Sequence, residues 1–212
     1  MIRAEQLTRH FGPVRAVDQV SFEIPRGRIV GFLGPNGAGK TTTMRMLCGV
    51  LAPDSGRASI DGIDVQVNRR GAATLLGWLP EGAPAYGELR VDEYLRFRAS
   101  LYGPHARRTI DRYVDQCGLA DVRRRLIGHL SRGFRQRVAL AASLVHEPAA
   151  LVLDEPGTGL DPVQQHAFRA LLRDLAQDRA ILLSTHQLGE ASAVCDDLLI
   201  IGQGRILAQG TI

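Results

Sequence analysis

The sequence predicts an α/β protein built on a mostly parallel β-sheet. Short apolar segments alternate with helix-like segments through the C-terminal half, the pattern of parallel strands that helices cover on both faces. A glycine-rich loop also separates a strand-like segment from a helix-like one near the N-terminus. The length of 212 residues suits one domain, residues 1–212, that carries an inserted lobe.

The individual elements follow from period-2 or apolar runs, from helical periodicity, and from Gly, Pro and Asp-Gly turns between them. Expected strands are residues 2–7, 20–24, 28–33, 58–60, 63–65, 75–79, 150–153, 180–183, 198–201 and 205–208. Helices are expected over 40–49, from Pro162 and from Leu188. The stretch 91–144 is helical in pattern, with breaks near Gly103 and Gly118, so we interpret about 86–145 as an inserted helical lobe.

Bulk composition excludes several classes of protein. No apolar run approaches the roughly 20 residues of a membrane-spanning helix, and the first residues lack an apolar signal region, so we expect a cytoplasmic location. Arginine clusters at 107–108 and 123–125 are open to nucleic acid or lipid, but no aromatic residues accompany them. We interpret them as solvated surface and expect no nucleic-acid partner. The three widely spaced cysteines fit packed or half-buried free thiols.

Residues 34–41 match the phosphate-binding pattern G-x-x-x-x-G-K-[ST] in full. Glycines let backbone N–H groups converge on phosphate oxygens, and the following helix adds the positive end of its dipole. Lys40, the only lysine among 26 Lys and Arg residues, supplies charge to the β- and γ-phosphates, and the Thr41 hydroxyl is a ligand for Mg²⁺. The expected nucleotide-binding residues here are Gly34, Pro35, Asn36, Gly37, Ala38, Gly39, Lys40, Thr41 and Thr42.

A second motif is the apolar segment 150–153 followed by Asp154 and Glu155. Ligands of open α/β sheets gather at the carboxyl ends of strands, so we expect Asp154 beside the Mg²⁺ that Thr41 holds. Glu155 then lies near the γ-phosphate and acts as the general base for the attacking water. Alone, an Asp-Glu pair after a strand is weak evidence for a catalytic site. In combination with the phosphate-loop motif it becomes strong evidence.

Further motifs stand in a fixed order along the whole chain. They are Phe11, Leu130 to Arg137 (Leu-Ser-Arg-Gly-Phe-Arg-Gln-Arg), Gly159 to Pro162 (Gly-Leu-Asp-Pro), and Ser184 to His186 (Ser-Thr-His). Together with the two motifs above they resemble the ATP-binding subunits of ABC transporters. The resemblance implies a P-loop NTPase (RecA-like) core with a mostly parallel sheet, an N-terminal antiparallel β subdomain and an inserted α-helical subdomain. It also implies ATP and Mg²⁺ as ligands.

The resemblance assigns roles to residues outside the phosphate loop. Two such subunits, as a homodimer or with a paralogue, sandwich two ATP molecules head to tail. Ser131 and the Gly133 backbone then hold the γ-phosphate across the interface, and His186 contacts it from the near side. Phe11 stands where the family places an aromatic ring against adenine.

The chain departs from the family pattern at three positions. Arg132 and Phe134 alter the usual Leu-Ser-Gly-Gly-Gln segment, and Glu81 takes the place of a glutamine. A glutamate only accepts hydrogen bonds, so we expect Glu81 to ligate Mg²⁺ or orient water. These forms resemble the gliding-motility and drug-export branch, which implies separate membrane subunits and export.

The family's helical lobe also has a groove for a cytoplasmic helix of the membrane subunit. The residues Tyr86, Tyr94, Leu95, Phe97 and Leu101 either line such a groove or form ordinary helix core, and we interpret most of them as core.

The leading hypothesis is an ATP-hydrolysing subunit that powers an ABC-type membrane exporter, held at the inner face of the cell membrane by a separate permease. A soluble ABC ATPase acting on ribosomes or DNA is the alternative, but those proteins usually have two cassettes or a long coiled coil. A regulator that binds ATP without hydrolysis is a third reading. The presence of Asp154, Glu155 and His186 argues against it.

Overall fold

A computed structural model describes all residues, 1–212, and arranges ten strands in two sheets. The first sheet has the strand order β2-β1-β4-β5 and is antiparallel throughout. Its strands are β1 (Ile2–Phe11), β2 (Val14–Ile24), β4 (Ser55–Ile60) and β5 (Ile63–Asp64). The β1–β2 hairpin is much longer than predicted, because its partners continue pairing to Phe11 and Val14 around Gly12, whose φ is +57°.

The second sheet has the order β10-β9-β3-β8-β7-β6. All its pairings are parallel except that between β9 and β10, which confirms the predicted mostly parallel sheet and α/β class. Its strands are β3 (Arg28–Leu33), β6 (Leu76–Leu79), β7 (Ala150–Leu153), β8 (Ala180–Thr185), β9 (Asp197–Gly202) and β10 (Arg205–Thr211). The central strands β7 and β8 are buried along their whole length.

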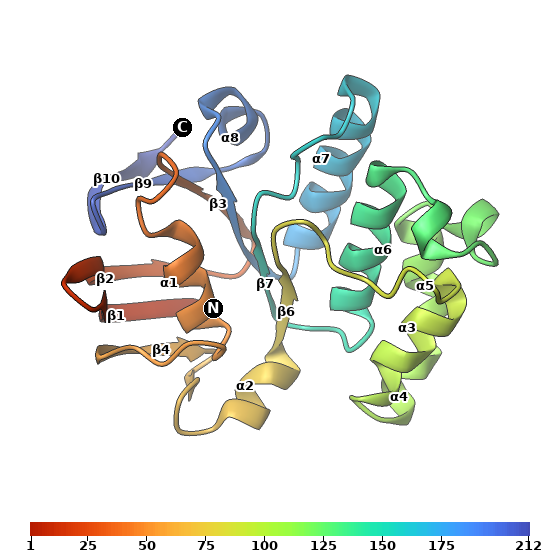
Figure 1. Ribbon diagram of the computed structural model, residues 1–212, viewed down its shortest axis with the longest axis horizontal. Helices are drawn as coiled ribbons and strands as arrows, with labels where there is room; N and C mark the ends of the chain where they lie inside the picture. Colours follow the sequence, from red (N-terminus) through yellow and green to blue (C-terminus); the bar gives the residue numbers. More distant parts are fainter.

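Helices cover both faces of this sheet (Figure 1). Side chains alternate along its strands, so Val152 and Leu182 join the core cluster that includes helix α1, while Leu151 and Leu183 join the cluster that includes α6 and α7. The helices are α1 (Lys40–Leu47), α2 (Arg69–Leu75), α3 (Val91–Ser100), α4 (Pro104–Arg108), α5 (Ile110–Gln116), α6 (Arg132–Leu144), α7 (Pro162–Ala176) and α8 (Leu188–Val194). Helix α2 was not predicted.

Helices α3 to α6 follow β6 and precede β7, and form a helical lobe on the side away from the antiparallel sheet (Figure 1). Helix α6 packs against α3, α5 and β6, so it joins the lobe to the sheet. The segment between α5 and α6 holds only two short 3₁₀ turns, at Ala120–Val122 and Ile127–His129. No helix in the chain has the length and apolar character needed to cross a bilayer.

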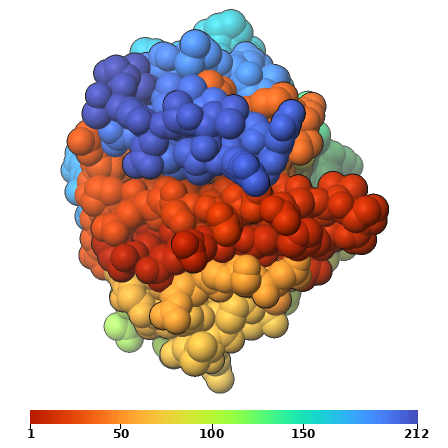
Figure 2. All heavy atoms as spheres, turned by 90° about the vertical axis from the view of Figure 1, so that its left-hand side faces the viewer, coloured from red at the N-terminus to blue at the C-terminus, as the bar shows by residue number.

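The N-terminal hairpin connects the two sheets. In Figure 2 it lies between strands β9 and β10 on one side and the β4–β5 segment on the other. The Asp18 amide donates to the Gly204 carbonyl at 2.8 Å, and Arg205 Nε donates to an Asp18 carboxylate oxygen at 2.5 Å. The hydrogen bond from Arg205 lowers the pKa of Asp18. These contacts hold β2 beside the loop after β9.

Candidate nucleotide-binding site

An open cavity of about 360 Å³ lies at the carboxyl ends of the parallel strands. It brings together residues from the phosphate loop, from the ends of β6, β7 and β8, and from the loop after β7. The lining residues are Ala16, Pro35, Asn36, Gly37, Gly39, Lys40, Thr41, Thr42, Glu81, Asp154, Glu155, Thr158 and His186. We call it the nucleotide cavity.

The phosphate loop joins β3 to α1 and depends on two glycines for its path. A Cβ at Gly34 would lie 2.4 Å from the Ile201 carbonyl oxygen, and one at Gly39, whose φ is +107°, would lie 2.6 Å from the Ala16 carbonyl oxygen. The buried Lys40 side chain turns back into this loop, where Nζ donates to the Gly34 carbonyl at 2.6 Å and the Pro35 carbonyl at 3.2 Å. The loop therefore fixes a single cation at its centre, with the N-terminus of α1 behind it.

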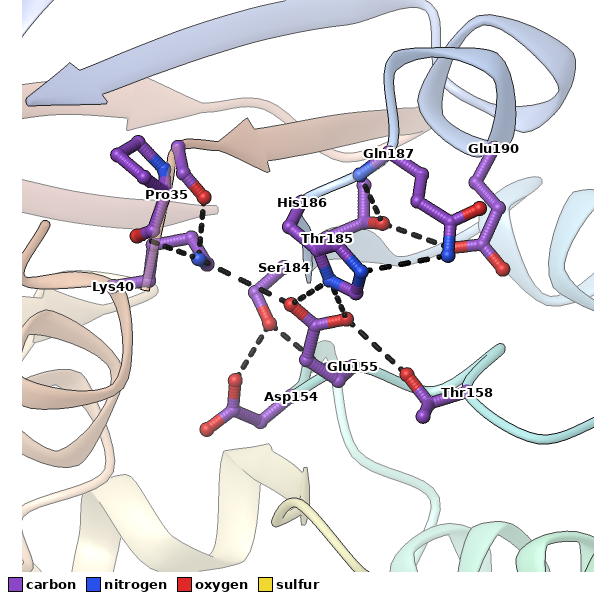
Figure 3. Close-up of polar contacts among 11 residues, drawn as sticks. Pro35, Lys40, Asp154, Glu155, Thr158, Ser184, Thr185, His186, Gln187 and Glu190 are labelled. Carbon is purple, nitrogen blue, oxygen red and sulfur yellow. Dashed lines mark hydrogen bonds and ion pairs between the residues drawn. The ribbon is translucent and has the colours of Figure 1, made fainter. Parts of the chain in front are cut away.

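Asp154 is positioned by the buried end of β8. Ser184 Oγ donates to Asp154 Oδ1 at 2.6 Å and accepts the Glu155 amide at 2.8 Å (Figure 3). The Asp154 amide in turn donates to the Leu79 carbonyl at 2.8 Å, so the chain leaving β7 is tied to both neighbouring strands. Asp154 and Ser184 are almost wholly buried, which makes this one of the most constrained parts of the cavity.

Glu155 lies at the centre of a polar cluster (Figure 3). Its backbone φ of +49° turns the chain sharply after β7. Thr158 Oγ1 donates to one carboxylate oxygen at 3.2 Å, and His186 Nδ1 lies 3.1 and 3.2 Å from the two oxygens. Lys40 Nζ is 4.0 Å away. The carboxylate is thus 11% exposed and held between a cation, a hydroxyl and an imidazole at the cavity wall.

The loop that carries His186 is hydrogen-bonded to α8 through Glu190. Thr185 Oγ1 donates to Glu190 at 2.8 Å and accepts the Gln187 amide at 3.1 Å. Glu190 itself fits against Gly157, where a Cβ would lie 2.4 Å from its carboxylate oxygen. The imidazole remains about half exposed, facing both Glu155 and the open cavity.

Most predicted site residues meet in this cavity, and Glu81 lines it directly after β6. Two lining residues, Ala16 and Thr158, were not predicted. Only its spacing, three residues after Glu155, could have indicated from the sequence that the Thr158 hydroxyl belongs to the site. Gly34 and Ala38 belong to the loop but stand behind its surface.

Three predicted nucleotide contacts lie elsewhere. Phe11 is 49% exposed at the end of β1, where the Arg9 guanidinium stands 5.2 Å from the ring centre. Ser131 caps α6 by accepting the Phe134 amide at 3.3 Å, and Gly133 lies against the Gln164 side chain. Neither of these two residues lines the nucleotide cavity of its own chain.

The donor set fits Mg²⁺. Thr41 and Asp154 both line the cavity and supply a hydroxyl and a carboxylate, and Asp154 Oδ2 has no hydrogen-bond partner, so one oxygen is free for a ligand. Mg²⁺ prefers one or two such oxygens with phosphate and water completing the shell. The chain accordingly contains no cluster of three His, Cys, Asp or Glu residues that would hold a metal alone.

Comparison with known protein families gives a match over residues 17–158 to the model described as "ABC transporter". The probable multidrug ABC transporter ATP-binding protein YbhF of Escherichia coli is 39% identical over 215 residues, covering 100% of this chain and 37% of that protein. The bacitracin transport ATP-binding protein BcrA of Bacillus licheniformis is 36% identical over 211 residues, covering 99% of this chain and 69% of that protein.

Among solved structures, one described as the ATP binding subunit of an ABC transporter superposes with a TM-score of 0.90 at 30% sequence identity. The superposition covers 100% of this chain and 90% of that one. The two structures therefore share one architecture, including the helical lobe.

Proposed function

The chain belongs to the ABC transporter family, and on the geometry of its nucleotide cavity we propose that it binds and hydrolyses ATP to power a membrane exporter whose channel is a separate protein. One observation supports the enzymatic part. The phosphate loop, the buried carboxylate of Asp154, the carboxylate of Glu155 and the imidazole of His186 meet at the carboxyl ends of the parallel strands. Glu155 joins them, because its carboxylate faces Lys40 and His186 together.

The proposed reaction is in-line attack of water on the γ-phosphate. Loop amides and Lys40 hold the β- and γ-phosphates, while Thr41 and Asp154 are the residues that hold Mg²⁺, which supplies charge neutralisation when bound. Glu155 accepts the proton of the attacking water, and Thr158 and His186 orient its carboxylate. Glu81, which also lines the cavity, orients water or completes the metal shell.

We propose that the working site needs two cassettes. Ser131 and Gly133 do not line their own cavity, so they contact ATP only from a second copy or a paralogue. The Ser131 cap leaves the other free amides of the first turn of α6 available to an anion. A homodimer satisfies this geometry without further components.

The transport assignment rests on relatives. YbhF is named as a probable multidrug transporter protein and BcrA as a bacitracin transport protein, so export of a small molecule is the proposed task here. These relatives do not support the soluble alternative. A separate permease then holds the cassette at the inner face of the cell membrane.

The lobe offers a surface for that permease. Tyr94 and Leu95 are buried, as interpreted, but Tyr86, Phe97 and Leu101 are 52%, 43% and 61% exposed. The interpretation of most of these residues as core was therefore wrong, because three of the five are exposed: Phe97 on α3, and Tyr86 and Leu101 on either side of it. Tyr86 packs edge-to-face on both Tyr94 and Phe97, giving a firm aromatic surface. We propose that a cytoplasmic permease helix contacts it.

The test is light scattering and phosphate release on Glu155→Gln protein, with Glu88→Gln as the control because Glu88 is exposed and forms no ion pair. With Mg-ATP, Glu155→Gln should shift from monomer to dimer and lose about 10²–10⁴ of its turnover, while retaining ATP binding. Near-wild-type turnover would contradict the assignment of Glu155. A protein that binds ATP and stays monomeric would contradict the two-cassette site for this chain alone.

A further inference from the structure

The turn between β9 and β10 contacts the phosphate loop, although none of its residues lines the nucleotide cavity. This β9–β10 turn consists of Gln203 and Gly204, whose φ values of +49° and +78° are typical of a two-residue hairpin turn. The Gly204 amide donates to the Ala38 carbonyl of the phosphate loop at 3.0 Å, and the Gly204 carbonyl accepts the Asp18 amide at 2.8 Å. The turn therefore joins the phosphate loop to β2.

The hydrogen bond to Ala38 fixes the orientation of the next amide in the loop. A trans peptide group is planar, so its C=O and its N–H point in opposite directions, and the chain contains no cis peptide bond. Because the Ala38 carbonyl faces Gly204, the Gly39 amide of the same peptide group points away from the turn. Gly39 lines the nucleotide cavity, and its amide forms no hydrogen bond within the chain. That N–H is therefore available to a phosphate oxygen.

Close packing leaves these segments little freedom to move apart or together. A Cβ at Gly39 would lie 2.6 Å from the Ala16 carbonyl oxygen, and a Cβ at Gly204 would lie 2.9 Å from the same oxygen. The Cβ position of Gly39 is also only 3.5 Å from the Gly204 Cα. The phosphate loop, β2 and the β9–β10 turn thus meet at one point beside the cavity.

A second contact fixes the turn against β2. Arg205, the first residue of β10, places Nε and Nη2 at 2.5 Å from the same Asp18 carboxylate oxygen. The Asp18 side chain is only 6% exposed, and the hydrogen bond from Arg205 lowers its pKa, so the carboxylate is charged at neutral pH. Asp18 therefore holds the turn twice, with its amide on Gly204 and its carboxylate on Arg205.

We infer that Gly204 and Arg205 are positioning residues for ATP binding, which hold the β9–β10 turn against the phosphate loop and so orient the Gly39 amide. A donor that is fixed before the ligand arrives needs no ordering when the ligand binds, which favours affinity. The amide contacts a phosphate in both the ground state and the transition state, so the effect falls on KM and leaves kcat unchanged. This inference rests on the proposed ATP binding and extends it to residues outside the cavity.

Two glycines provide a matched pair of variants. Gly62 has the same place in the β4–β5 turn as Gly204 in the β9–β10 turn, with a φ of +80°, but a Cβ there would meet no atom within 4 Å. Both alanine variants therefore carry similar backbone strain, and only Gly204→Ala presses on the Ala16 carbonyl. Gly204→Ala should raise the Kd and the KM for Mg-ATP about 3–10-fold at unchanged kcat, as expected for one weakened hydrogen bond. Equal values in the two variants would overturn the inference.

Arg205→Gln tests the same contact without backbone strain. It should raise the Kd of Mg-ATP and of inorganic tripolyphosphate by a common factor of about 3–10, because both ligands use the phosphate loop. Arg205→Lys should restore most of the affinity. The control is Arg57→Gln, which removes an exposed arginine paired with Glu5 at 3.9 Å, and it should change neither Kd.

The possible outcomes are distinct. A weaker affinity of Arg205→Gln for ATP alone would assign the effect to the β1–β2 hairpin rather than to the phosphate loop, and would overturn the inference. Urea unfolding of the same variant detects a purely structural role: reduced stability with unchanged Kd values would overturn the inference as well. Absence of ATP binding by the wild-type protein would contradict the proposed function, and the inference with it.

Discussion

Ser184→Ala should be far more destabilising than its size suggests, because one hydroxyl serves two groups. Ser184 Oγ donates to the Asp154 carboxylate and accepts the Glu155 amide, with the serine and the aspartate buried. Leaving a buried donor unpaired costs about 1–3 kcal/mol, and a hydrogen bond to a charged group contributes about 1.5–3 kcal/mol. The Glu155 amide is only half-buried, so we expect about 2–4 kcal/mol in the free energy of unfolding. That loss corresponds to about 4–16 °C in Tm for a chain of this length.

Ser143 provides the matched control. It is equally buried, but its hydroxyl donates only to the Leu140 carbonyl within α6, and no backbone donor depends on it. Ser143→Ala should cost at most about 1 kcal/mol, since alanine is also the better helix former. Urea unfolding followed by the fluorescence of Trp78 measures both variants. Equal destabilisation, within about 0.5 kcal/mol, would refute the account of Ser184 as the tie between β7 and β8.

Two further predictions concern the hydroxyl of Thr158 beside the Glu155 carboxylate and the buried side chain of His146. Thr158→Val should lower ATP turnover about 3–30-fold with unchanged ATP affinity, because it removes a hydrogen-bond donor 3.2 Å from the Glu155 carboxylate. Thr158→Ser keeps the hydroxyl and should retain normal turnover. An unaltered kcat in Thr158→Val would contradict the prediction. His146 has a folded-state pKa of about 4, against about 6.5 in the unfolded chain, so the unfolded chain binds the proton first and stability falls from pH 6.5 to 4 by about 3 kcal/mol. His146→Phe should flatten that part of the pH profile of unfolding, and an unchanged slope would contradict the prediction.

The sequence was most informative where one local pattern fixes one structure. The strand 28–33, the phosphate loop and the helix from Pro162, capped by Asp161 accepting the Gln164 amide at 2.8 Å, appear as predicted. The prediction was weakest where pairing between strands, rather than local sequence, determines the bounds of an element. No strand was predicted over residues 8–19, because the segment is mostly polar and contains Gly12 and Pro13. In the structure it extends the β1–β2 hairpin by backbone pairing. Helix α2 was also missed, since only Ala72 in it is buried and it has little apolar periodicity.

The residues of the nucleotide cavity also fall into two groups, those that could be predicted from the sequence and those that could not. Its phosphate loop and paired carboxylates were readable, because glycines, Lys40 and two acids after an apolar run have few other uses together. Thr158 was missed, since a lone hydroxyl in a loop has no pattern, and its contact with Glu155 exists only because the chain turns at a φ of +49°. For Phe11 the assigned contact with adenine stays a prediction.

By itself the sequence predicted the chemistry of this protein: which groups would bind phosphate, which would hold a metal and which would accept a proton. Those predictions rest on side-chain types at short spacings, which can be recognised before the fold is known. Only the tertiary structure decided which groups meet. It tied Asp154 to Ser184 from 30 residues away, and it brought Thr158 and His186 to the carboxylate of Glu155. Such contacts depend on packing between distant segments, where each position is fixed by many weak contacts at once.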